Sequence, residues 1–172
     1  MKHNWIIKAF ILTFFLALII SGISNLIVER CGFIVLLIIT IIIVLIGIIA
    51  DIIGTSVLTA NEATFHAKAS NKIKGSKESI NLIKNNSNIA NFCNDIIGDI
   101  CGIVSGSMGA MIAIYASMHL TINNTLSTLL ISSIISSIMV GGKAIGKEIA
   151  VKKSDEIIFI VGNILSKFKG KE

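Results

Sequence analysis

The sequence predicts an all-α integral membrane protein: a helical bundle of four transmembrane helices with additional cytoplasmic or interfacial amphipathic helices. Of its 172 residues, 53% are hydrophobic and only 15% are charged, a balance outside that of ordinary soluble domains. Its longest apolar stretches reach about 20 residues, enough for a helix to cross a hydrocarbon core of about 30 Å. Lipid cannot satisfy free backbone groups, and the stretches are too long for barrel strands, so helices are expected.

The first apolar stretch, residues 9–28, contains no charged residue. It is longer than the apolar core of a signal peptide, which has about 7–15 residues, and no small-residue cleavage pattern follows it. We therefore expect a retained transmembrane helix and assign it residues 1–30 as an extra N-terminal segment. Glu29, Arg30 and Gly32 predict a tight turn into the second span.

The second span begins near Cys31 and carries no charge between there and Asp51. Residues 52–61 are uncharged as well, so the same helix is expected to continue past Asp51 and to place Asp51 and Glu62 at or below the headgroup level. Carboxylates at that depth are costly and normally face a polar cavity or a partner. Asp51 and Glu62 are therefore the first candidates for functional residues.

A basic segment, residues 64–88, follows. Its charged residues are five lysines and a single acid: Lys68, Lys72, Lys74, Lys77, Lys84 and Glu78. Apolar residues recur in it loosely at helical spacing, which predicts an amphipathic helix lying along the membrane and anchored by lysines on anionic lipid. A solvated basic loop is the alternative interpretation.

The third span, about residues 89–118, is unusually polar. Gly98, Gly102 and Gly106 form one helical stripe, a pattern that lets membrane helices approach closely. Asp95 and Asp99 are four residues apart and are expected on one face, where two carboxylates repel each other unless a cation or a proton lies between them.

The fourth span, about residues 125–144, is rich in serine and glycine, and it leads to a basic stretch and an amphipathic segment, Asp155–Phe168. We assign residues 152–172 to a basic C-terminal helix. Every Lys and Arg except Arg30 lies before the first span, between the second and third, or from Lys143 onward. By the positive-inside rule we expect a multi-pass protein of the cell (plasma) membrane with both termini in the cytoplasm.

The sequence contains no helix-borne His pair, no Cys-x-x-Cys, no phosphate-binding glycine loop and no nucleophile elbow. We therefore expect no enzyme activity, no catalytic residues and no bound cofactor. The net charge of +5 comes from lysines beside apolar spans, so nucleic acid is not expected as a partner.

Three local motifs resemble the membrane domain of the CorB/CorC and cyclin M (CNNM) magnesium transporters. Thr59-Ala60-Asn61-Glu62-Ala63 resembles the S-A-S-E-T-A-L signature of that family. Asn94-Asp95 falls where the family has an Asn-Asn pair, and the segment 142–147, GKAIGK, lies over its G-E-I-x-P-K motif. The assigned domain is residues 31–151.

The resemblance implies a homodimer in the lipid bilayer that exports Mg²⁺, with Na⁺ as the coupling ion, and holds the metal through serine, asparagine and glutamate oxygens. Carried over, the metal ligands fall on Thr59, Asn61, Asn94 and Asp95, and Glu62 and Asp99 join them as candidate oxygen ligands. The chain departs from the pattern in two places, since Lys143 replaces the family's glutamate and Gly146 its proline. We therefore expect a membrane domain without the regulatory CBS domains that normally follow it in the family.

Two functions remain open at this stage. The chain is a small divalent-cation (Mg²⁺) transporter, or it is a transport-inactive structural or regulatory membrane subunit in which the Lys143 ammonium takes the place of the metal beside Asp95 or Asp99. A third interpretation gives the acids a packing role only, with Asn, Ser and water as their partners.

Overall fold

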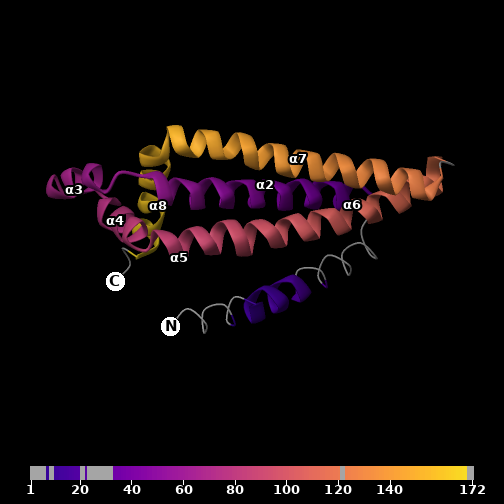
Figure 1. The fold of residues 1–172 in the computed structure, drawn as a ribbon, viewed down its shortest axis with the longest axis horizontal. Coiled ribbons are helices and arrows are strands. Elements are labelled where there is room, and N and C mark those ends of the chain that lie inside the picture. The colour runs from indigo at the N-terminus through magenta and orange to yellow at the C-terminus, as the bar shows by residue number, and fades with distance from the viewer. Residues whose placement is uncertain (1–6, 8–9, 20–21, 23–32, 121–122, 170–172) are drawn as a thin grey trace. The chain divides into compact units, whose positions relative to one another are not determined.

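The computed structural model describes residues 7, 10–19, 22, 33–120 and 123–169. Every regular element in these residues is a helix, which confirms the all-α prediction. Within the described part of the chain, three helices are long and apolar enough to cross a membrane: Phe33–Thr59, Asn86–Met118 and Asn124–Lys152. The chain is therefore a membrane protein with at least these three candidate spans (Figure 1).

The predicted first span is described only in part. Phe10–Ile19 form an apolar helix that is too short by itself to cross the membrane, and the rest of residues 9–28, apart from Gly22, lies outside the described residues, as does the predicted turn at Glu29–Gly32. A fourth transmembrane helix therefore stays a prediction.

Helix α2 (Phe33–Thr59) continues without a break past Asp51, as the uncharged sequence after that residue predicts. One stripe of its buried residues recurs every three or four positions, at Leu36, Thr40, Val44, Gly47, Asp51 and Gly54, and Ala50, Ser56 and Val57 are buried beside it. This spacing keeps one face of the helix against the protein. Of the remaining isoleucine and leucine side chains, most are exposed, as lipid-facing residues of a span are, and the others are half-buried.

The third candidate span is not a uniform α-helix. It consists of α5 (Asn86–Ala90), a π-helical segment η1 (Asn91–Ile97) and α6 (Gly98–Leu120). A π-helical segment has i→i+5 hydrogen bonds, and such segments often occur at functional sites. The α-helical spacing argument for Asp95 and Asp99 does not hold across this segment, because Asp95 belongs to η1.

Helix α7 (Asn124–Lys152) extends about two turns beyond the predicted end of the fourth span. Neither the glycines nor the lysines between Gly141 and Lys152 end it, since glycine only weakens a helix interior and lysine is a good helix former. The consequence is that Lys143 and Lys147 lie on the same helix as the apolar span.

The basic segment after α2 is helical, so the solvated-loop alternative is wrong for most of it. It forms α3 (Glu62–Ser70), α4 (Ser76–Lys84) and α5. The predicted C-terminal amphipathic segment forms α8 (Ser154–Lys169). Helix α4 packs against both α3 and α8, so its apolar residues meet other helices of the chain.

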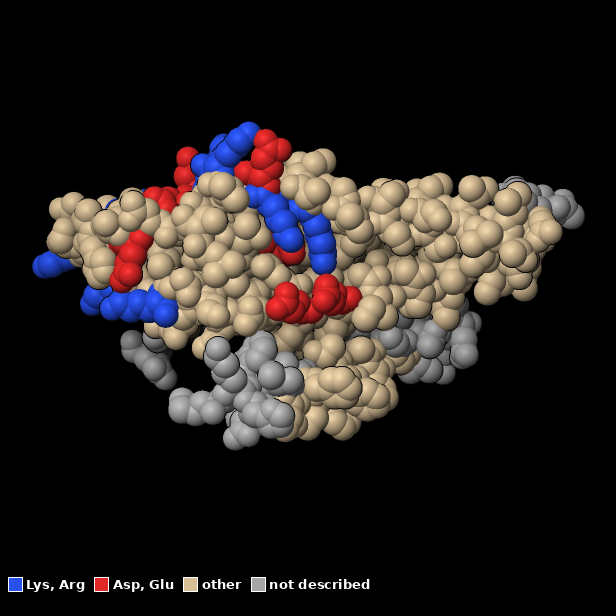
Figure 2. All heavy atoms as spheres, in the orientation of Figure 1, with Lys and Arg blue, Asp and Glu red and all other residues tan. Residues whose placement is uncertain are grey.

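The chain divides into two compact units, which are described separately. Unit 1 comprises Met1–Gly47 and Ile96–Gly142, and unit 2 comprises Ile48–Asp95 and Lys143–Glu172. Asp99 is the only Asp, Glu, Lys or Arg among the described residues of unit 1, so nearly all of the blue and red spheres in Figure 2 belong to unit 2.

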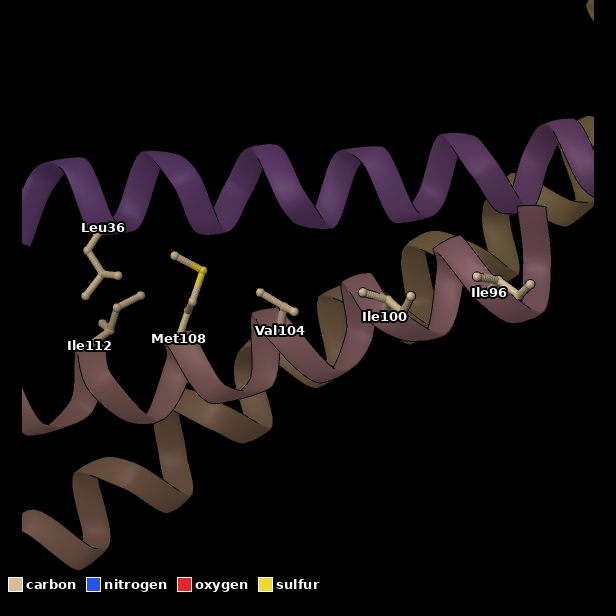
Figure 3. Close-up of a cluster of buried hydrophobic side chains, with 6 residues drawn as sticks. All are labelled: Leu36, Ile96, Ile100, Val104, Met108 and Ile112. Carbon is tan, nitrogen blue, oxygen red and sulfur yellow. The ribbon is translucent and has the colours of Figure 1, made fainter. Parts of the chain in front are cut away.

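The core of unit 1 is aliphatic. It contains Leu36 of α2 together with one stripe along the third span: Ile96, Ile100, Val104, Met108 and Ile112. Figure 3 shows Leu36 opposite Ile112, with the Met108 side chain directed toward α2. The four-residue spacing of the stripe places it on one face of α6.

The core of unit 2 is smaller and joins four helices. Val57 of α2, Phe65 of α3, Ile83 of α4 and Ile158 of α8 are buried together. The Lys68 ammonium lies 4.3 Å from the centre of the Phe159 ring, where it covers the edge of this core. The residues after α2 therefore fold back on one another as a packed helical cluster.

Candidate functional site

Asp51 is the most deeply buried charged side chain of the described residues. Its side chain is only 3% exposed, although it lies on a helix built to cross a membrane. The Lys147 Nζ atom lies 3.6 Å from Asp51 Oδ2, and the Lys147 side chain is 54% exposed. A half-exposed ammonium therefore balances a buried carboxylate.

A close approach of α7 to α2 brings these two groups together. A Cβ atom on Gly146 would lie 2.8 Å from Cγ1 of Ile52, so a larger residue at this position would force the Ile52 side chain or the two helices to move. Gly146 precedes Lys147 and Ile52 follows Asp51, so this contact lies directly beside the ion pair. At 3.6 Å the pair is joined by charge attraction rather than by a hydrogen bond, and Asp51 Oδ2 has no hydrogen-bond partner among the described residues.

Asn94 approaches α2 from the third span. A Cβ atom on Gly54 would collide with Asn94 Oδ1 and would lie 2.7 Å from Asn94 Cγ, so the asparagine side chain rests directly on the glycine backbone. Asn94 Oδ1 is buried and has no hydrogen-bond partner among the described residues. Its position in η1 fits the frequent occurrence of π-helical segments at functional sites.

Together, Asp51, Gly54, Asn94 and Lys147 form what we name the Asp51–Asn94 site. Asp51 and Gly54 are three residues apart on α2, about 4.5 Å along its axis, so the two unsatisfied oxygens lie around the same helical turn. Buried oxygens of this kind normally have a hydrogen-bond partner, because leaving them unsatisfied costs about 1–3 kcal/mol each. A bound cation or an ordered water is the kind of partner that each of these oxygens lacks.

Three of the residues predicted as metal ligands have their polar groups engaged at the α2–α3 junction. The Thr59 hydroxyl donates to the carbonyl oxygen of Thr55, 3.1 Å away. Asn61 caps α3, its Oδ1 accepting the Ala63 N–H at 3.0 Å. Glu62 Oε1 lies 3.0 Å from Nε2 of His66, one turn further along α3.

The junction also contacts the start of α8. The Asn61 backbone N–H donates to Oδ1 of Asp155 at 2.8 Å, and Thr59, Asn61 and Asp155 line a pocket of about 250 Å³. Lys152 and Lys153 line the same pocket. Glu156 lines it as well, so the structure brings Thr59 and Asn61 together beside two carboxylates and two ammonium groups.

The remaining predicted ligands differ in how deeply they are buried. Asn94 is partly buried, Asp95 is exposed on η1, and Asp99 is exposed at the start of α6. Asp99 belongs to unit 1, whereas the other five predicted ligands belong to unit 2. Among the described residues, no three His, Cys, Asp or Glu side chains gather where they could hold a metal ion, so a cation site here would depend on amide, hydroxyl or water oxygens as well.

The sequence reading identified Asp51 as a functional candidate but did not assign its partners. Lys147 lies 96 positions away, and nothing in the one-dimensional pattern ties it to Asp51. The only available signals were Gly54, one turn after the acid, and Gly146, directly before the lysine. Both are glycines inside helical patterns, and such glycines often mark a close packing contact.

No family model matches the chain, and comparisons with curated proteins and with solved structures found no match.

Proposed function

We propose that this chain is a membrane protein that binds a divalent cation at the Asp51–Asn94 site and transports it across the bilayer. One observation carries the proposal: two buried oxygens, Asp51 Oδ2 and Asn94 Oδ1, lie around one turn of a candidate transmembrane helix without hydrogen-bond partners among the described residues. An anionic and a neutral oxygen are ligands that hard cations such as Mg²⁺ prefer.

The chemistry of the site suits a partly hydrated cation. Mg²⁺ keeps several waters and is commonly held by one or two carboxylates, so one carboxylate and one amide oxygen are a sufficient protein contribution. Lys147 supplies the positive charge that Asp51 needs when no metal is bound. Because its ammonium is half exposed and 3.6 Å away, it can move toward water as a cation enters.

The resemblance to the CorB/CorC and cyclin M transporters points to the same activity, with Mg²⁺ as cargo and Na⁺ as coupling ion. In this proposal both termini face the cytoplasm, as the lysine distribution predicts. Thr59, Asn61, Glu62, Asp95 and Asp99 remain candidate ligands along the ion's path.

We also propose that the chain acts as a homodimer. Added Cβ atoms on Gly102 and Gly106 would meet nothing within 4 Å, so this part of the glycine stripe faces open space in a single chain. Stripes of small residues in membrane helices commonly serve close helix contacts. Gly102→Leu should therefore shift the purified protein from dimer to monomer in detergent, as measured by light scattering, and an unchanged dimer contradicts this role.

The test combines binding with transport. Purified protein should gain thermal stability with increasing Mg²⁺, because a ligand of the folded state stabilises it in proportion to the logarithm of its concentration. Asp51→Asn should abolish this gain and the Mg²⁺ flux in proteoliposomes. Glu148→Gln removes an exposed carboxylate of α7 and should change neither measurement. A wild type that shows neither stabilisation nor flux refutes the proposal.

A second candidate function is a transport-inactive structural or regulatory subunit in which a lysine permanently occupies the ion site. The contact between Lys147 and Asp51 favours it. The pairing of Lys143 with Asp95 or Asp99, expected from the sequence, stays a prediction. If Lys147 occupies the ion site, Mg²⁺ should leave the wild type unchanged and should stabilise only Lys147→Gln, whose carboxylate is uncompensated. Thermal melts of the two proteins with Mg²⁺, and with Ca²⁺ as a size control, separate the two functions.

A further inference from the structure

A second polar feature of unit 2 is independent of the Asp51–Asn94 site. A pocket of about 750 Å³ lies between the turn that joins α3 to α4 and the end of α8. Four lysines line it, and we name it the basic pocket: Lys72, Lys74 and Lys77 come from the turn and from α4, and Lys167 comes from α8. Residues about 90 positions apart thus contribute ammonium groups to one cavity.

The wall between α4 and α8 is held by backbone contacts, so the pocket is built into the fold. Gly75 has a φ of +83°, which favours glycine, and a Cβ atom there would lie 2.7 Å from the backbone nitrogen of Asn163. On the facing helix, a Cβ atom on Gly162 would lie 2.6 Å from the carbonyl oxygen of Gly75. The Ser79 hydroxyl, fully buried, reaches the carbonyl oxygens of both Gly75 and Ile158.

Among the residues that the structure describes, the charge of the basic pocket is not balanced by carboxylates. Glu78 is the only acid that lines it, against four lysines. No carboxylate of the described residues lies within 4 Å of the ammonium groups of these four lysines. Like charges that share a cavity repel each other, and an anion with two or more charges would remove that repulsion.

The start of α4 adds donors suited to a phosphate group. The first N–H groups of a helix have no partner within the helix, and the capping residue Gly75 has no side chain to accept from them. The Ser76 N–H donates to the carbonyl oxygen of Ile73 at 3.3 Å, so the donors that α4 offers are those of Lys77 and Glu78. Lys77 and Glu78, in this first turn, line the basic pocket. The helix dipole favours an anion at this end.

We propose that the basic pocket binds the phosphate group of an anionic ligand, either a phospholipid headgroup or a free phosphate compound. Lysine binds phosphate as a point charge, so four lysines around one cavity suit a doubly charged or polyphosphate anion without fixing the rest of the ligand. An anionic headgroup held here would anchor the helical cluster of unit 2 to the membrane surface.

The test uses the full chain in a zwitterionic detergent without divalent cations. Pyrophosphate is the soluble probe, and nanodiscs with and without phosphatidylglycerol in phosphatidylcholine provide the lipid arm. Lys74→Gln/Lys167→Gln removes one charge from each wall of the pocket. Lys84→Gln/Lys153→Gln is the matched control, since it removes two exposed lysines that do not line the pocket.

We expect the melting temperature to rise saturably with at least one probe. The affinity for that probe should fall about tenfold or more in the pocket variant and less than about twofold in the control. A response to phosphatidylglycerol alone assigns a headgroup, a response to pyrophosphate alone assigns a free phosphate compound, and both outcomes support the pocket. No response to either probe, or an equal loss in the control, overturns it. The pocket variant should fold normally, because the replaced side chains are exposed and repel each other.

Discussion

The interiors of the two units are built from different contacts. The core of unit 1 consists of aliphatic and methionine side chains, with Met108 and Val104 fully buried among them. In unit 2, glycines allow backbone and polar groups to touch, as at Gly54 with Asn94 and at Gly162 with Ser79. Among the described residues, four buried side chains, all in unit 2, have a polar atom without a hydrogen-bond partner. Three of them lie on α2 or η1: Asp51, Ser56 and Asn94.

The difference is visible along a single helix. The buried face of α2 carries Leu36, Thr40 and Val44 in unit 1 and then Asp51 and Gly54 in unit 2, with the same spacing throughout. The hydroxyl of Thr40 donates to the backbone of its own helix, so it requires no partner elsewhere. The spacing of the buried positions is therefore similar along this face, but the side chains change from mostly apolar to acidic and small. The part of the helix with Asp51 and Gly54 is the part suited to a polar ligand.

The largest effect is expected where unit 2 is closest packed. Gly162→Ala places a methyl group 2.6 Å from the Gly75 carbonyl oxygen and 3.1 Å from the Ser79 backbone nitrogen, and such overpacking should lower the free energy of unfolding by about 3 kcal/mol. Gly141→Ala is the control, since nothing lies within 4 Å of its added Cβ, and it should be neutral or stabilising by up to about 1 kcal/mol. Equilibrium unfolding in mixed micelles, followed by circular dichroism, measures both; equal effects would contradict the backbone contact.

A smaller effect is expected from a cavity in unit 1. Met108→Ala should lower the free energy of unfolding by about 2 kcal/mol, at the low end for such substitutions, because lipid is as apolar as the core and only packing is lost. Met118→Ala makes the same chemical change at a side chain that is 75% exposed and should have almost no effect. The same unfolding experiment compares them, and a Met118 effect as large as that of Met108 would show that the aliphatic cluster is not the core.

Removing the charge that balances Asp51 should destabilise unit 2 without any change in packing. An exposed ion pair contributes about 0–1 kcal/mol, whereas breaking a fully buried one costs about 3–5 kcal/mol. Lys147 is half exposed, so Lys147→Gln should lie between these limits, at about 1.5 kcal/mol. Lys152→Gln breaks an exposed pair with Glu148 and should change the unfolding free energy by less than about 1 kcal/mol. Added Mg²⁺ should stabilise Lys147→Gln more than Lys152→Gln, because only the first leaves the Asp51 carboxylate without an ammonium beside it. A loss in Lys152→Gln of equal size would argue against a special role for Asp51.

The smallest effect concerns the contact between the Lys68 ammonium and the Phe159 ring, whose centre is 4.3 Å away. Phe159→Leu keeps an apolar side chain but removes the ring, and it should lower the free energy of unfolding by about 0.5–1 kcal/mol. A double-mutant cycle with Lys68→Met isolates the pair, because the second substitution should have a reduced effect once the ring is gone. Phe168→Leu, at a side chain that is 81% exposed, is the control. Additive effects in the cycle would show that the ring and the ammonium do not interact.

The sequence by itself determined the elements. Uninterrupted apolar residues predicted α2 and its continuation past Asp51, and spaced apolar residues among lysines predicted the helices after it. A helix is held by hydrogen bonds within its own segment, and the spacing of apolar residues in that segment indicates which side chains avoid water. The local sequence is therefore enough to predict it. The same reasoning identified Asp51 as a functional candidate, because a carboxylate within a membrane helix requires a partner wherever the rest of the chain lies.

Only the tertiary structure decided which groups meet. Lys147 contacts Asp51, Asn94 rests on Gly54, and Lys167 shares a pocket with Lys74. All three contacts depend on how closely pairs of helices approach each other. Glycines at the contacts set those distances, and a glycine in a sequence does not show which distant residue will rest on it. The π-helical segment at Asn94 was likewise invisible, since its turn of i→i+5 hydrogen bonds has no residue pattern that separates it from an ordinary α-helix.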